Sequence, residues 1–162
     1  MLCLAALLGS AATATAQSFE VPTGYSLKAK EDYARYNQDV IAATTWLETT
    51  PTNQEAAKHQ ATNQFLMQWL TGTPAVSVEV QSYVAPLFKK NPELLMAFLA
   101  GWSRYQLQHP DDHDTLNLNT AGVQTALRVY QLGGLKKDKQ IEELLALQQK
   151  GELAGWIKSK LT

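Results

Sequence analysis

The sequence predicts an all-α protein, a single-domain bundle of about six to seven helices joined by short connections. Three observations indicate this class. Apolar side chains recur at three- and four-residue steps along most of the chain. Proline, glycine and capping residues interrupt these stretches at intervals typical of helix lengths. A single stretch, residues 76–80, alternates apolar and polar side chains as a strand does.

Residues 1–16 have the pattern of a signal peptide. Residues 2–8 are almost wholly apolar, small residues follow, and residues 14–16 read Ala-Thr-Ala, the small-residue pattern of a cleavage site. We therefore expect export to the periplasm or the extracellular space, with Gln17 as the first mature residue. Cleavage removes Cys3, the one cysteine of the sequence, so the mature chain is expected to have neither disulfides nor thiol chemistry. The apolar run is shorter than the ~20 residues of a transmembrane helix, so we expect no integral membrane segment in the mature chain.

The mature sequence divides into an extended lead-in over residues 17–26 and a helical domain over residues 27–162. Proline and glycine in the lead-in argue against helix there. The first predicted helix covers residues 27–48 and ends before Pro51. Its apolar stripe consists of Tyr33, Tyr36, Val40, Ala43 and Leu47.

The second predicted helix opens at Thr52 and ends near Gly72. Thr52 and Glu55 have the spacing of a capping box, in which each side chain satisfies a backbone N–H at the helix start. His59 lies one turn beyond Glu55, and we expect these two residues to form a surface pair. The alternating residues 76–80 fit two structures equally, a short strand and an extended segment that is not paired.

The clearest predicted helix begins at Asn91 as N-cap, with Pro92 at the first helical position. Apolar residues cover most of its circumference, which is typical of a central, buried helix. Gly101 within it is expected to permit the close approach of a neighbour. The helix should end at His109, before Pro110.

Three helices are predicted after a polar loop over residues 111–117. Asn119 or Thr120 is expected to cap the first of them, and Asp138 the second. Gly151 precedes a short last helix.

Charge and motifs exclude several functions. The chain has 14 Lys and Arg against 15 Asp and Glu, a net charge of −1, and no basic patch of the kind that binds nucleic acid. It has no nucleophile elbow, phosphate-binding loop or dinucleotide motif, so no cofactor is predicted.

The candidate ligand-binding residues are Trp102, Arg104 and Tyr105 on the central helix. Aromatic side chains there fit either a ligand cleft, including one that stacks on sugars, or core packing, and core packing is the commoner use. The same choice applies to the remaining tryptophans. A partly buried Arg104 needs an acidic partner, which we expect within the chain.

The candidate metal ligands are His109, Asp111 and His113. Imidazole and carboxylate groups this close in sequence suit a divalent ion. Their spacing matches no established site, and a solvated loop between helices is the commoner use of such residues.

The chain resembles uncharacterised exported proteins of Bacteroidetes bacteria. The residues that carry the resemblance are 91–96, 101–105, 110–112 and the lead-in 19–22. The resemblance implies export and a bacterial origin, and it implies no catalytic residues. We therefore expect a non-catalytic binding or structural domain, with an unknown protein or envelope component as partner. The alternative is a small metal-dependent or carboxylate-using hydrolase. Residues 76–80 and exposed aromatic side chains are the expected contact surfaces.

Overall fold

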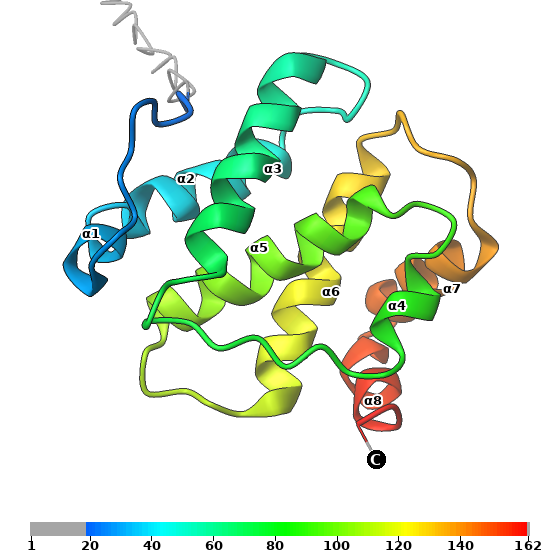
Figure 1. Ribbon diagram of the computed structural model, residues 1–162. Coiled ribbons are helices and arrows are strands. Elements are labelled where there is room, and N and C mark those ends of the chain that lie inside the picture. The colour runs from blue at the N-terminus through cyan, green and yellow to red at the C-terminus, as the bar shows by residue number, and fades with distance from the viewer. Residues whose placement is uncertain (1–18, 162) are drawn as a thin grey trace, which may run out of the picture.

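A computed structural model describes residues 19–161, and in this range the chain forms eight helices and no strand (Figure 1). The all-α class is therefore confirmed, and the predicted signal peptide lies outside the described residues. The helices are α1 (Lys30–Ala34), α2 (Asn37–Leu47), α3 (Ala56–Leu70), α4 (Val84–Leu87), α5 (Glu93–Gln108), α6 (Thr115–Gln131), α7 (Lys139–Gln149) and α8 (Leu153–Lys158).

The centre of the molecule is the pair α5 and α6, which share the largest contact between any two of the described helices. A Cβ added at Gly101 of α5 would collide with Thr125 and lie 2.8 Å from the carbonyl oxygen of Ala121. A Cβ added at Gly122 of α6 would lie 2.6 Å from the ring of Phe98. The two glycines let the backbones approach closely, which confirms the role expected for Gly101.

The predicted helix over residues 27–48 is wrong in one respect, because the chain forms two helices, α1 and α2, with a break between them. The carbonyl of Tyr33 accepts hydrogen bonds from the N–H of Tyr36 and from the indole of Trp69, each at 3.0 Å. These two hydrogen bonds to the carbonyl of Tyr33 stabilise the turn at the break. Trp69 is fully buried, so the bond ties α1 to the core.

The lead-in is extended over residues 19–26, as predicted, and packs onto α2 and α3. The buried ring of Phe19 lies 6.1 Å from that of Trp46, and the ring of Tyr25 lies 5.3 Å from that of Phe65. The lead-in therefore contributes side chains to the hydrophobic core.

The capping box predicted at Thr52 is wrong, because α3 begins four residues later, at Ala56. The hydroxyl of Thr52 donates to the carbonyl of Gly133 at 3.4 Å. Glu55 has a left-handed backbone, with φ of 46°, and its carboxylate lies 3.9 Å from the ammonium of Lys58. The side chains of Thr52 and Glu55 thus interact with Gly133 and Lys58 and do not form a capping box.

Residues 76–81 form an extended segment that is not paired with a strand, and this segment leads from α3 to α4 (Figure 1). Of the two structures that fit the alternating residues, the extended segment is therefore the one observed. The indole of Trp102 donates to the carbonyl of Ser77, whose N–H donates to the side chain of Gln106, both at 3.2 Å. Val76 is buried and Val80 is 52% exposed. The alternation reflects an extended chain lying on a helix.

The cap predicted for the sixth helix, Asn119 or Thr120, is wrong. The helix begins at Thr115, and the carboxylate of Asp114 caps it by accepting from the N–H of Asn117 at 3.0 Å. Asn119 is fully buried inside the helix, where its side chain bonds Tyr83 of the segment before α4. The cap predicted at Asp138 is confirmed, since its carboxylate accepts from the N–H of Gln140 at 3.0 Å.

Asn91 does not cap α5 with its side chain, contrary to the prediction. Its amide instead bonds both backbone groups of Lys136, donating to the carbonyl at 3.0 Å and accepting from the N–H at 2.9 Å. Asn91 is 2% exposed. It therefore fastens the loop between α6 and α7 to the start of α5.

Replacing Asn91 with alanine should lower the free energy of unfolding by about 2 kcal/mol, because two buried hydrogen bonds to Lys136 are lost. Urea titration followed by circular dichroism measures the change. Asn53→Ala is the matched control, since Asn53 is exposed. A loss in Asn91→Ala no larger than in the control would contradict the assigned role of Asn91.

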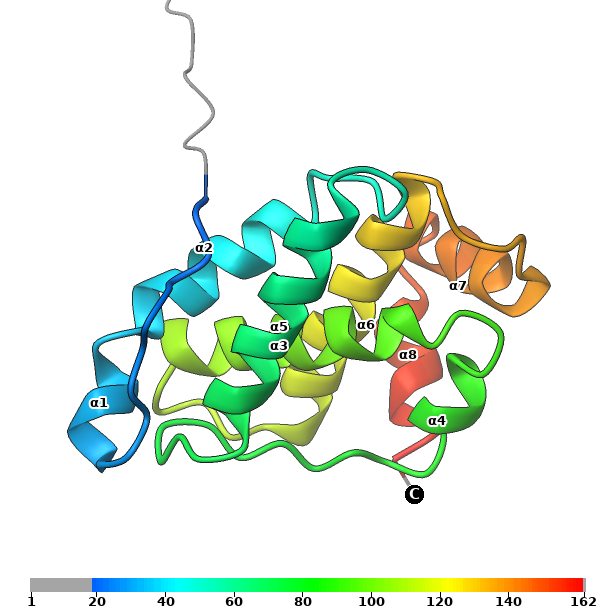
Figure 2. The same ribbon diagram turned by 45° about the horizontal axis from the view of Figure 1, so that its top comes forward.

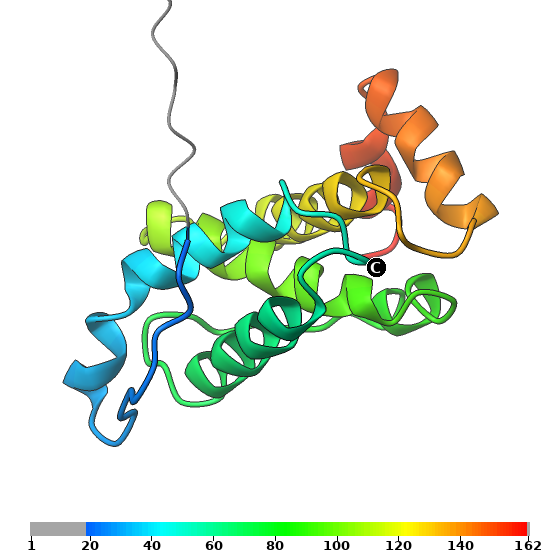
Figure 3. The same ribbon diagram turned by 90° about the horizontal axis from the view of Figure 1, so that it is seen from above.

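α4, α7 and α8 gather at one end of the bundle, and α1 lies at the opposite end (Figures 2 and 3). Across residues 19–161, no helix has both the length and the apolar character needed to span a membrane.

Candidate ligand-binding groove

An open groove of about 550 Å³ lies at the end of the bundle where α4, α7 and α8 meet. α7 and Lys150, the residue after it, supply one wall. Trp156 of α8 and Lys160, two residues beyond α8, supply another. Pro86 of α4 and Tyr83, the residue before α4, complete the lining. The volume falls within the range of about 300–1,000 Å³ that is typical of small-molecule sites. The lining residues are Tyr83, Pro86, Gln140, Glu143, Leu144, Ala146, Leu147, Lys150, Trp156 and Lys160.

The aromatic part of the groove consists of Trp156 and Tyr83, both half-buried. Their ring centroids are 5.7 Å apart and their planes meet at 88°, an edge-to-face arrangement. The hydroxyl of Tyr83 donates to Asn119 at 2.8 Å, and burial raises the pKa of this phenol. Tyr83 is thus held in place as a neutral hydroxyl and braces the indole of Trp156.

The charged part of the groove has an excess of positive side chains. The ammonium of Lys160 lies over the indole of Trp156, 5.4 Å from the ring centroid. Lys150 and Lys160 form no ion pair within residues 19–161. Glu143 is the one acidic lining residue, and its carboxylate lies 3.9 Å from the ammonium of Lys139. The groove can therefore stack a flat apolar face and attract negative charge.

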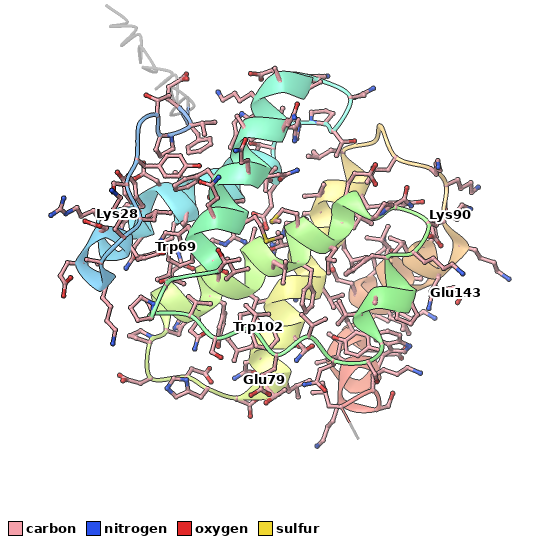
Figure 4. The ribbon with its side chains drawn as sticks, in the orientation of Figure 1. Lys28, Trp69, Glu79, Lys90, Trp102 and Glu143 are labelled. Carbon is pink, nitrogen blue, oxygen red and sulfur yellow. The ribbon has the colours of Figure 1, made fainter. Side chains whose placement is uncertain are left out.

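In Figure 4, the end of the molecule that forms the groove lies apart from the two labelled tryptophans of the core. Glu143 lies at the end of the molecule formed by α4, α7 and α8, whereas Trp69 and Trp102 lie among the packed helices. Trp156, on the short helix α8, is the tryptophan among the lining residues of the groove.

The three predicted ligand-binding residues lie elsewhere. Trp102 is 1% exposed and forms part of the core. Arg104 makes two hydrogen bonds of 2.7 Å to the carboxylate of Glu48, the acidic partner expected within the chain. Tyr105 donates to Asp112 at 2.7 Å, which raises the pKa of the phenol. None of the three lines the groove between α4, α7 and α8.

The three predicted metal ligands lie on the exposed turn between α5 and α6. Within residues 19–161, no three His, Cys, Asp or Glu side chains form a group that could hold a metal ion. His109 packs against Tyr105, with ring centroids 4.5 Å apart, and His113 lies 3.5 Å from Gln106. Asp111 and His109 line a shallow, open hollow of the same turn.

Asp112 organises this turn. Its carboxylate accepts from Tyr105 at 2.7 Å, from the N–H of Asp114 at 2.9 Å and from Asn117 at 3.0 Å. The hydrogen bond from Tyr105, followed by those from Asp114 and Asn117, lowers the pKa of Asp112. The polar residues of the turn therefore fold the connection between two helices.

His59 is not part of a surface pair with Glu55, contrary to the prediction. It is 8% exposed, packs on Trp46 with ring centroids 4.5 Å apart, and bonds the carbonyl of Pro51 through Nε2 at 3.1 Å. It also lines a cavity of about 80 Å³ with Asn63, whose buried side-chain oxygen has no hydrogen-bond partner in the described structure. That volume suits a few water molecules.

Sequence reasoning missed the groove because its walls are far apart along the chain. The sequence does not distinguish Trp156 from the other three tryptophans, each of which fits either a cleft or the core. The sequence contains one indication of the groove, which is the shortness of the helix that carries Trp156. A helix as short as α8 cannot bury the side chains around its whole circumference. Trp156 has the exposed residues Ala154 and Gly155 on one side and the exposed Lys158 two residues beyond it.

Comparisons with known proteins add no relative. No protein-family model matches the chain, and neither a curated protein nor a solved structure matches it.

Proposed function

We propose that this chain is an exported, non-catalytic binding domain that holds a saccharide in the groove between α4, α7 and α8. The observation that carries the proposal is the half-buried indole of Trp156 in an open groove. A tryptophan face suits the flat C–H face of a sugar ring, because it offers a large apolar surface with little conformational entropy to lose. Gln140 and Glu143 lie within the same groove to pair with hydroxyl groups.

The lining residues favour binding over hydrolysis. Glycoside hydrolysis uses two placed carboxyl groups, and Glu143 is the one carboxylate among the lining residues. The lining also contains no histidine, serine or cysteine to act as a base or nucleophile. The groove thus offers contacts without the pair of groups that sugar chemistry requires.

Export is supported by the apolar run and small-residue site within residues 1–16 and by the resemblance to exported Bacteroidetes proteins. Mass spectrometry of the protein recovered from its native host tests this part. The expected natural N-terminus is Gln17, and a chain that retains Met1 would contradict export by this signal.

Binding is tested with an array of neutral and acidic oligosaccharides, followed by titration of each hit monitored by tryptophan fluorescence. Trp156→Ala should weaken binding about tenfold or more, because the stacking surface is lost, while Trp156→Phe should retain part of the affinity. Met67→Ala is the control, since Met67 is 43% exposed on α3, away from the groove. Hits that bind Trp156→Ala as well as the wild type would refute the proposal.

A further inference from the structure

We infer that the saccharide is acidic, with a carboxylate on the sugar ring that stacks on Trp156, as in a uronic acid unit. This inference rests on the proposed function and specifies its ligand. The carboxylate would pair with Lys160 and Lys150, while the C–H face of the same ring lies against the indole.

The first support is the charge left uncompensated in the groove. Lys150 and Lys160 have no acidic partner within residues 19–161, although both line the groove. The ammonium of Lys139 lies next to the carboxylate of Glu143, so it reduces the repulsion between this carboxylate and an incoming anion. A groove with two ammonium groups that have no acidic partner in the described part of the chain, and with one compensated carboxylate, favours an anionic ligand over a neutral or cationic one.

The second support is where the ammonium of Lys160 lies. It is 5.4 Å from the centroid of the Trp156 indole, above the ring. A sugar ring that stacks on this face of the indole displaces the ammonium to the edge of the sugar ring, where the two remain close. A uronic acid carries its carboxylate directly on a ring carbon, so stacking and ion pairing can occur together. Lys160 is exposed, and its flexible stem lets the ammonium adjust to the carboxylate.

The lining also distinguishes a saccharide from an acidic peptide. Peptide strands are commonly bound through backbone groups at an exposed sheet edge. Most of this lining lies in α7 and α8, where helical hydrogen bonds already occupy the backbone, and the N–H of Lys160 bonds the carbonyl of Ile157 at 2.8 Å. Pro86 has no N–H to donate. The groove thus offers side chains, which suit the hydroxyl and carboxylate groups of a sugar.

The test compares trigalacturonate with its methyl ester, which has the same sugar rings without the charge. Wild-type protein should bind the acid about tenfold more tightly than the ester at low salt, and the difference should shrink as salt is added. Lys150→Gln and Lys160→Gln should each weaken binding of the acid roughly fivefold and leave binding of the ester unchanged. Lys28→Gln is the matched control, since Lys28 lies at the other end of the molecule (Figure 4).

The outcomes separate the inference from the function on which it rests. Equal affinity for acid and ester, lost in Trp156→Ala, would overturn the acidic ligand and keep saccharide binding. Failure of both sugars, with a polyglutamate peptide bound through Lys150 and Lys160, would overturn the saccharide itself. Failure of all three probes would overturn both proposals. Circular dichroism of each variant excludes unfolding as the cause of a loss.

Discussion

Gly101→Ala should lower the free energy of unfolding by about 1–2 kcal/mol, although alanine is the better helix former. The new methyl group would meet Thr125 and lie 2.8 Å from the carbonyl oxygen of Ala121, so α5 and α6 must move apart. Overpacking of a core costs about 1–3 kcal/mol, occasionally more, and exceeds the gain of up to about 1 kcal/mol in helix propensity. Gly122→Ala should act in the same direction, because its methyl group would meet Phe98.

The chain provides a matched control for this substitution in Gly155 of α8. A Cβ at Gly155 has no neighbouring atom within 4 Å, so Gly155→Ala should stabilise the protein by about 0.5–1 kcal/mol. Urea titrations of the three variants measure these differences. Equal stability of Gly101→Ala and Gly155→Ala would show that α5 and α6 are not in close contact.

Removing the carboxylate of Glu48 is the second change with a large expected effect. Glu48, at the end of α2, accepts from Arg104 of α5 at 2.7 Å and from Arg128 and Thr125 of α6 at 2.6 Å and 2.8 Å. Its side chain is 11% exposed and that of Arg104 is 18% exposed. Glu48→Ala leaves the Arg104 guanidinium unpaired in a poorly solvated place, which should cost about 3 kcal/mol.

Two comparisons make this expectation specific to the buried pair. Arg128→Ala should cost about 1 kcal/mol or less, because Arg128 is 44% exposed and its partner Glu48 keeps Arg104. Glu79→Ala, an exposed acidic residue without an ion pair in residues 19–161, should change stability by less than about 0.5 kcal/mol. If Glu48→Ala is no less stable than Arg128→Ala, the buried pair contributes little.

Glu48 should also make stability depend on pH. Burial of this carboxyl raises its pKa, but the hydrogen bonds from Arg104, Thr125 and Arg128 outweigh that effect and lower it below the ordinary value of 4.5. A group whose pKa is lower in the folded state binds protons more readily when unfolded. Its stabilisation is therefore complete above about pH 4.5 and is lost as pH falls through the lowered pKa. Glu48→Gln should remove this part of the acid dependence, which urea titrations between neutral and acidic pH would measure.

The regular parts of the fold could be predicted because they depend on neighbours in sequence. Apolar periodicity indicated the buried central helix and its glycine contact, and Asp138 caps the helix it precedes. The errors share one physical cause. Thr52 and Asn91 have the chemistry of caps, but their side chains bond Gly133 and Lys136, which lie far away in the chain.

The same cause explains the break between α1 and α2 and the unexpected site. The break occurs where Trp69 donates to a carbonyl 36 residues earlier. The groove combines Tyr83 with Trp156, which lie together because α8 packs against α6 and Tyr83 bonds Asn119 of α6. Periodicity reports which residues face inward on one helix, and it carries no information about which half-buried residues of different helices meet.

α7 is attached to the rest of the molecule through few contacts, so we expect its local stability to be lower than that of the central pair α5 and α6. α7 contacts α6 and α8 modestly, in contrast to the extensive α5–α6 pair, and the loop before it is fastened by Asn91. Segments with few packed contacts open without unfolding the rest. α7, which forms one wall of the groove, can thus open without unfolding of the central pair. A ligand bound in the groove would suppress this local opening, and it would also raise the free energy of global unfolding, because it binds the folded state alone.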